Sequence, residues 1–254
     1  MPDGPVVLLT GDGDSGRIGA HYLAARFDTL RVVVEQPVPR ATFLRRRLRS
    51  LGPLTVAGQL AFLVCQRFQE RASRHRIAAI LDQYKLVDRW PEGAMTRVSS
   101  VNGDDCVALL RALQPAVVLV TGTRLIARAV LQSIDAPFIN YHAGITPKYR
   151  GVHGGYWALA EDDAAHCGVT IHLVDAGIDT GAALYQELIA PTEDDNFSTY
   201  PYLQLATALP LLERAAQDAL AGRLVPRKAD LPSRLWSHPT IWRYLSTGLR
   251  RRVW

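Results

Sequence analysis

Short apolar runs alternate with amphipathic segments along most of the chain, and the two patterns predict different elements. Strands are predicted at Val6–Thr10, Arg31–Glu35, Ala116–Val120, Phe138–Asn140, Val169–Val174 and Ala183–Ile189. Helices are predicted at Ser15–Phe27, Gly103–Leu113, Thr123–Val130, His153–Glu161 and Thr199–Ala221. Strands that alternate with helices are typical of a parallel sheet with crossover helices. The predicted fold class is therefore α/β, a Rossmann-like parallel sheet flanked by helices.

Residues 36–100 differ in character from the rest and predict a helical insertion. Arg40–Leu48 has a basic, helical pattern, and Leu54–Val87 follows the Gly52-Pro53 break as one or two helices. We expect residues 1–222 to form a single domain and residues 223–254 to form a short C-terminal appendage.

Composition is ordinary for a globular protein of 254 residues, with 48% hydrophobic and 21% charged residues. Three cysteines without metal-ligand spacing fit a reducing compartment and predict no metal site. With no secretory signal and no apolar run of about 18 residues, a cytoplasmic location is expected.

The net charge of +5 is concentrated locally, above all in Arg45, Arg46, Arg47 and Arg49. An apolar stretch, Leu60–Cys65, follows soon afterwards and is compatible with a peripheral membrane contact. A helical cover over the sheet or a homodimer contact explains the same stretch, and the sequence leaves these alternatives open.

The candidate catalytic residues follow two of the predicted strands. Asn140 and His142 stand two positions apart at a strand end, so their side chains point to the same side. Asp179 follows a second strand in a Gly-containing turn. An amide can donate a fixed hydrogen bond, an imidazole can carry a proton near neutral pH, and a carboxylate can orient that imidazole. This set suits oxyanion stabilisation and proton transfer, which acyl transfer requires.

These residues carry a family resemblance. The chain resembles the formyltransferases that use 10-formyltetrahydrofolate, whose pattern is roughly (I/V)-N-x-H-x-S-L-L-P-x-x-R-G, followed about 35 residues later by D-x-x-x-D-T-G. The matching residues are Asn140, His142, Pro147, Arg150, Gly151, Asp175, Asp179, Thr180 and Gly181. His142 and Asp179 are 37 residues apart, which is close to the family spacing. The chain departs from the pattern at Gly144-Ile145-Thr146, where the family has Ser-Leu-Leu.

The resemblance implies roles for particular residues. It implies that Asn140, His142 and Asp179 are catalytic, with the Asn140 amide and a protonated His142 holding the oxyanion while Asp179 raises the pKa of the imidazole. It implies a binding site for 10-formyltetrahydrofolate, the formyl donor. That site comprises Arg124, Leu125, Ile126, Asp175, Gly177 and Ile178. Substrate contacts are expected from Gly11, Gly13, Tyr149, Arg150 and Gly151. His172, seven residues before Asp179, either lines the site or is an ordinary sheet histidine.

A rival motif lies near the start of the chain. Gly11, Gly13 and Gly16 spell G-x-G-x-x-G after a strand, and Glu35 ends the next strand. This is the dinucleotide-binding fingerprint, although Asp12 and Asp14 would place negative charge beside a pyrophosphate. A plain strand-to-helix turn, or a cradle for a substrate phosphate, are the alternatives.

The expected function is formyl transfer from 10-formyltetrahydrofolate to a primary amine of a small molecule, with an amino sugar or nucleotide-linked sugar favoured. Nucleic acid is not expected as a partner, because about 30 residues follow residue 222 and the methionyl-tRNA enzymes carry an extra β-barrel domain. The alternatives are a formyltetrahydrofolate hydrolase, an NAD-dependent oxidoreductase and a non-catalytic module that binds folate or sugar.

Overall fold

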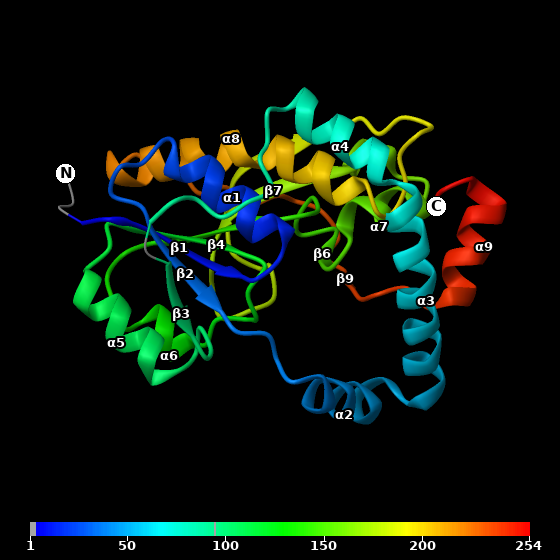
Figure 1. Cartoon of the computed structure of the whole chain (residues 1–254), viewed down its shortest axis with the longest axis horizontal. Helices are drawn as coiled ribbons and strands as arrows, with labels where there is room; N and C mark the ends of the chain where they lie inside the picture. Colours follow the sequence, from blue (N-terminus) through cyan, green and yellow to red (C-terminus); the bar gives the residue numbers. More distant parts are fainter. Residues whose placement is uncertain (1–3, 94) are drawn as a thin grey trace.

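A mostly parallel sheet organises the chain. The computed structural model describes residues 4–93 and 95–254, apart from the side chains at 40, 43 and 46. Seven strands form one sheet in the order β3-β2-β1-β4-β5-β7-β8 (Figure 1). They are β1 (Val6–Gly11), β2 (Arg31–Glu35), β3 (Met95–Val98), β4 (Val117–Thr121), β5 (Phe138–His142), β7 (Gly168–Leu173) and β8 (Ala183–Leu188). Two short strands, β6 (Arg150–Gly151) and β9 (Leu235–Trp236), pair with each other separately.

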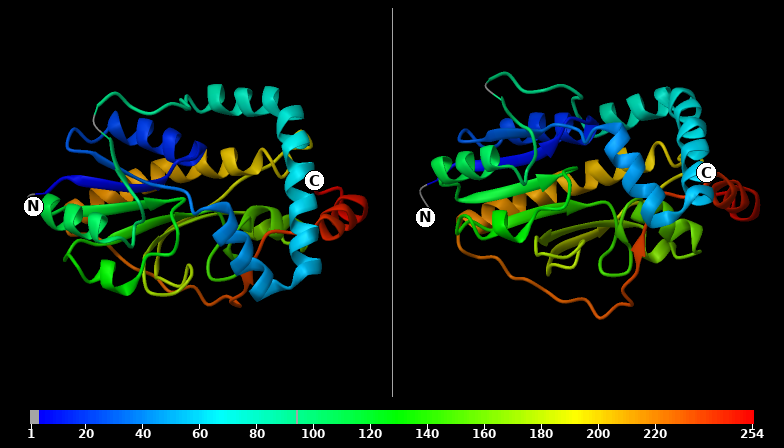
Figure 2. Two further views of the ribbon diagram at one scale, coloured as in Figure 1. Left: turned by 60° about the horizontal axis from the view of Figure 1, so that its bottom comes forward. Right: turned by 90° about the horizontal axis from the view of Figure 1, so that it is seen from below.

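Helices cover both faces of the sheet. The helices α1 (Asp14–Ala24) and α8 (Tyr200–Leu220) lie on one face, and α5 (Asp104–Leu113) and α6 (Arg128–Leu131) lie on the other (Figure 1). The remaining helices are α2 (Arg40–Leu51), α3 (Pro53–Ala72), α4 (Arg74–Gln83), α7 (Gly154–Ala160) and α9 (Ile241–Arg251). In both views of Figure 2, α3 stands at the end of the sheet with α9 beside it.

The alternation of side chains along β1 explains why both faces are apolar. Val6 and Leu8 point into the core shared with α1 and α8, whereas Val7 and Leu9 point into the core shared with α5. All four side chains are at most 1% exposed. A strand buried on both faces reads as a continuous apolar run, which is why the central strands are predicted correctly from the sequence.

The predicted Rossmann-like parallel sheet is confirmed, and one edge of it is antiparallel. β5 pairs antiparallel with β7, and β7 pairs antiparallel with β8. β7 and β8 are joined by residues 174–182. A parallel crossover needs about a dozen residues or more, so this connection is too short for one and forms a hairpin. The hairpin tip carries Asp179, and the antiparallel register therefore shapes the site.

The segment after β4 also differs from its prediction. A helix was expected over Thr123–Val130, but α6 covers only Arg128–Leu131. The backbone N–H of Arg124 donates to the Glu35 carboxylate, and that of Ala127 donates to the Asn102 side chain. Side chains therefore satisfy backbone amides of a segment that is not helical.

Inside residues 36–100 the helical prediction is confirmed for α2, α3 and α4, with the break between the last two at Ser73. The sequence pattern missed β3, which joins the sheet as its outer strand beside β2. It also missed β9 and α9, which pair with β6 and pack on α3 respectively. β3 and β9 have four and two residues, so their apolar pattern is weak.

Candidate active site

Asn140 and His172 face each other across β5 and β7. The two residues are directly opposite in the antiparallel register, and the Asn140 Nδ2 atom lies 3.1 Å from His172 Nε2. The His172 Nδ1–H donates to the Leu173 carbonyl at 2.8 Å, so in the neutral ring Nε2 accepts a hydrogen from Asn140. An amide nitrogen carries two hydrogens, and Asn140 keeps the second for a ligand in the cavity that it lines.

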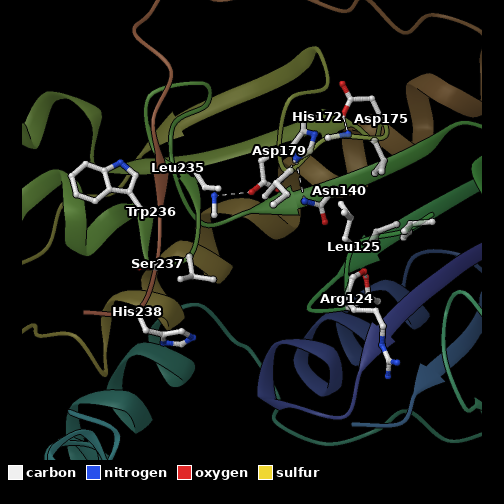
Figure 3. Close-up of a pocket in the computed structure, with 18 of the residues that line it drawn as sticks. Arg124, Leu125, Asn140, His172, Asp175, Asp179, Leu235, Trp236, Ser237 and His238 are labelled. Carbon is white, nitrogen blue, oxygen red and sulfur yellow. Dashed lines mark hydrogen bonds and ion pairs between the residues drawn. The ribbon is translucent and has the colours of Figure 1, made fainter. Parts of the chain in front are cut away.

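Asp179 lies between two imidazoles. Its Oδ2 is 3.4 Å from His142 Nδ1, and its Oδ1 is 3.6 Å from His172 Nε2. The backbone N–H of Gly151 donates to Oδ2 at 2.8 Å. The Gly151 N–H orients the carboxylate beside the two imidazoles, and Asp179 has a left-handed backbone φ of 50°. The hairpin tip thus presents a fixed carboxylate beside Asn140 (Figure 3).

His142 is buried behind Asp179. Its side chain is 5% exposed and is absent from the cavity lining, and its Nε2 lies 2.7 Å from the Tyr149 carbonyl. Because a carbonyl only accepts, Nε2 carries a hydrogen and Nδ1 faces the carboxylate. A second proton placed on Nδ1 is therefore shared with Asp179. This geometry places His142 Nδ1 where it can exchange a proton with the carboxylate.

Burial and the neighbouring charges shift the pKa values of His142 and Asp179 in opposite directions. Burial lowers the pKa of His142, and the nearby Asp179 charge and the Tyr149 carbonyl do not fully offset it. The net direction is opposite to the increase expected from the sequence. Burial raises the pKa of Asp179, but contacts from His172, His142 and the Gly151 N–H outweigh it and hold that pKa below the ordinary value. In the unliganded chain near neutral pH, the carboxyl is ionised and the imidazole is neutral.

Gly144 explains the departure from the family loop. A Cβ at Gly144 would lie 2.6 Å from the Tyr149 carbonyl oxygen and 2.9 Å from His142 Nε2. The loop therefore folds tightly over the imidazole, and only glycine fits between them. The Thr170 hydroxyl fixes the same loop by accepting from the Thr146 N–H and donating to the Gly144 carbonyl.

The cavity has a volume of about 580 Å³ and two walls. One wall is formed by the segments after β4 and β7, and it includes the predicted folate-binding residues. Those that line it are Arg124, Leu125, Ile126, Asp175, Gly177 and Ile178. Leu125 and Ile178 are 53% and 42% exposed. Their side chains therefore offer apolar surface to a ligand in the cavity. The hairpin is braced by Asp175, which accepts from the Gly177 N–H and the Thr180 hydroxyl.

The opposite wall is formed by residues that are not among the site residues predicted from the sequence. β9 and the residues after it contribute Leu235, Trp236, Ser237 and His238 (Figure 3). The helix α2 contributes Arg47. Burial lowers the pKa of the Arg47 guanidinium, and His238 lies near it. No local motif marks residues 235–238, because they reach the cavity through the pairing of β9 with β6.

The predicted substrate-contact residues are only partly brought together. Gly151 lines the main cavity, and the Arg150 guanidinium donates to the Ile178 carbonyl at 3.0 Å. Tyr149 is buried, and its hydroxyl donates a hydrogen bond to the Asp163 carboxylate. Gly11 and Gly13 line a separate cavity of about 350 Å³, which shares Thr123 and Arg124 with the main one.

Glu35, the acidic residue of the dinucleotide interpretation, has its hydrogen-bonding partners within the chain. Glu35 is 5% exposed, accepts the N–H groups of Val101 and Arg124, and pairs with the Arg124 guanidinium at 2.6 Å. Its carboxylate is therefore already engaged by donors from this chain, although Glu35 also lines the small cavity beside the turn. Asp12, in the turn itself, pairs with Arg97 at 2.8 Å. Among the residues that the structure describes, no group of three or more His, Cys, Asp or Glu side chains could hold a metal ion.

Comparison with known proteins identifies relatives. Residues 50–202 match the family model described as formyl transferase. Methionyl-tRNA formyltransferase of Anaeromyxobacter dehalogenans (strain 2CP-C) is 35% identical over 138 residues, which cover 54% of this chain and 44% of that protein. The chain spans about half the length of the curated relatives it matches.

Solved structures share the fold. The N-formyltransferase from Helicobacter canadensis, in complex with folinic acid and dTDP-3-aminofucose, has a TM-score of 0.55 at 15% identity and aligns with 91% of this chain and 70% of its own. Glycinamide ribonucleotide transformylase 1 from Symbiobacterium toebii has a TM-score of 0.52 at 19% identity and aligns with 92% and 94%, respectively.

Proposed function

Because this chain belongs to the formyl transferase family, we propose that it transfers a formyl group from 10-formyltetrahydrofolate to a primary amine of a small molecule. The observation that carries the proposal is the convergence of Asn140, Asp179 and His172 on one cavity with two different walls. One wall suits the formyl donor and the other suits the amine acceptor.

The wall after β4 and β7 has the chemistry that a folate needs. A pterin is flat and aromatic with hydrogen-bonding edges, and Leu125, Ile126 and Ile178 offer apolar surface beside the backbone of the hairpin. When bound, the donor supplies a formyl group already activated on nitrogen.

The residues around Asn140 have the groups for the transfer step. The amine nitrogen attacks the formyl carbon, the bond from that carbon to the folate nitrogen breaks, and the proton lost by the amine ends on the folate nitrogen. Asn140 donates to the oxyanion that develops on the formyl oxygen. Asp179 accepts the amine proton and passes it on, while His142 holds the carboxylate and its proton from behind.

An amino sugar linked to a nucleotide is the acceptor that the second wall favours. Arg47 places a guanidinium at the cavity, which suits a phosphate, and Ser237 and His238 offer polar groups for sugar hydroxyls. The Helicobacter canadensis neighbour is in complex with such a sugar, which supports the proposal.

The test follows tetrahydrofolate release by purified protein given 10-formyltetrahydrofolate alone, and then with nucleotide-linked amino sugars, glycinamide ribonucleotide or initiator methionyl-tRNA. We expect turnover only with an amino sugar, and loss of turnover in Asn140→Ala. Turnover without any amine would instead identify a hydrolase, and failure to bind the folate would overturn the proposal.

A further inference from the structure

Three helices form a lobe at one end of the molecule. α2 and α9 both pack against α3, and together we call them the helical lobe (Figures 1 and 2). The contact between α3 and α9 is close, because a Cβ at Gly58 would lie 2.2 Å from the Trp242 ring. Gln69 donates to the Tyr244 hydroxyl at 2.6 Å, and the Phe62 and Tyr244 rings are 5.0 Å apart.

The outer surface of the helical lobe is apolar. On α3, the side chains of Leu60, Val64 and Phe68 are 47%, 55% and 65% exposed, and their spacing of four puts them on one face. α9 adds a second stripe. Its members are Trp242, Leu245 and Leu249, and the last is 78% exposed. α2 adds Leu44, Leu48 and Leu51, each more than a third exposed. Exposed apolar side chains that recur on three neighbouring helices in this way mark an interaction site.

The same helices are strongly cationic. The sequence places five arginines in α2, two in α3 and three in α9, whereas Glu70 is the single acidic residue within these three ranges. The remainder of the chain has nineteen basic and twenty-three acidic residues. The positive net charge of the protein therefore belongs to the helical lobe, and the rest of the molecule is acidic.

We infer that the helical lobe binds the surface of an anionic phospholipid bilayer. Helices with leucine and aromatic side chains on one face and arginine beside them lie in the bilayer interface, where anionic headgroups attract the arginines. A second copy of the chain would set like charges against each other. Nucleic acid would satisfy the arginines but would leave the stripe of Leu60, Val64 and Phe68 in water. No helix among the described residues could cross a membrane, so the contact is peripheral.

Docking in this way would bring the active site to the bilayer. Arg47 of α2 lines the main cavity, so the lobe and the cavity share a residue.

The test measures co-sedimentation of the full chain with vesicles of phosphatidylcholine alone or mixed with phosphatidylglycerol. We expect binding to the anionic vesicles, weakened by salt. Arg45→Glu with Arg49→Glu should weaken it on the order of tenfold or more, since each arginine at a charged membrane surface contributes about fivefold. Val64→Ser with Phe68→Ser should weaken it similarly by removing buried apolar surface. Formyl transfer to a soluble acceptor should not change in either variant.

Matched controls lie outside the helical lobe. Arg111→Glu with Arg128→Glu changes the net charge equally, and Leu188→Ser with Val225→Ser removes equally exposed apolar groups. Binding that falls as much in these controls would overturn the inference, as would equal binding to neutral vesicles. Dimers that dissociate in the Val64→Ser, Phe68→Ser variant without lipid would assign the surface to a second copy. Displacement of vesicles by an RNA oligonucleotide, with no effect of the serine substitutions, would assign it to nucleic acid.

Discussion

At the scale of single residues, some groups of the site line the cavity, and others are buried beneath the residues that line it. Asn140 and Asp179 line it, whereas His142 is hidden under the loop that Gly144 permits. His172 gives Asn140 its orientation by accepting one of its two amide hydrogens. Substitutions at these positions should therefore differ in the nature of their effect on activity as well as in its size.

Asn140→Ala should reduce kcat by about 10²–10³, because one donor to the developing oxyanion contributes about that much. Steady-state release of tetrahydrofolate measures the loss. Gln132→Ala, at an exposed polar position, is the control and should keep the full rate. A rate for Asn140→Ala within a few-fold of the wild type would contradict the oxyanion role.

His142 and Asp179 should behave as one unit. We expect His142→Ala and Asp179→Asn each to reduce kcat by about 10²–10⁴, and the double variant to be little worse than either. Asparagine keeps an acceptor for the Gly151 N–H, so the hairpin should survive. Losses that multiply in the double variant would show that the two residues act independently.

The pH dependence of kcat/KM should report the buried imidazole. Since burial lowers the pKa of His142, the neutral form persists below pH 6.5, and activity should fall only when the pH drops through that lowered value. The residual activity of His142→Ala should lack this acid limb. An unchanged limb in that variant would assign the titration to another group.

At the scale of elements, the pairing of β6 with β9 builds the cavity wall that we propose for the acceptor. Gly151 has a φ of 96°, and a Cβ there would lie 2.2 Å from the Trp236 carbonyl oxygen. The pairing thus needs glycine both for its backbone conformation and for close approach. Its neighbour in sequence, Arg150, ties the same segment to the hairpin tip through Ile178.

Gly151→Ala should displace β9 and with it residues 235–238 of the wall. We expect a raised KM for the acceptor and destabilisation of roughly 1–3 kcal/mol from backbone strain alone. Urea unfolding and acceptor titrations measure the two effects. Gly19→Ala in α1 is the matched control, because its Cβ would meet only Leu209 at an ordinary 3.8 Å. Equal KM values in the two variants would argue against an acceptor role for the wall.

At the scale of the whole molecule, the C-terminal segment is bound to the body by buried groups. His153, at the start of α7, lies 2.9 Å from His238, which follows β9. Burial lowers the pKa of His153 to about 3 and that of His238 to about 4. Both imidazoles are therefore neutral in the folded protein at neutral pH.

The free energy of unfolding should fall as the pH is lowered from about 6.5 to about 4. In that window the unfolded chain takes up protons on both histidines and the folded chain does not, which costs up to about 1.4 kcal/mol per pH unit for each group. Urea unfolding at several pH values measures the slope. His238→Asn should make it shallower, while His75→Asn, at an exposed position, should leave it unchanged.

The sequence alone determined the parts of this protein that are local. The apolar runs of the central strands, the Asn140 and His142 pair and the turn with Asp179 are each readable within a few residues, because side-chain alternation and turn chemistry are short-range effects. The family resemblance rests on the same residues.

Only the tertiary structure decided which of these groups share a cavity. The antiparallel register sets His172 against Asn140, and the β6–β9 pairing brings residues 235–238 to the cavity lined by Asn140, almost a hundred residues earlier in the chain. Burial then reversed the direction of the pKa shift expected for His142. Register, long-range pairing and desolvation depend on the packing of distant segments, and no window of the sequence contains them.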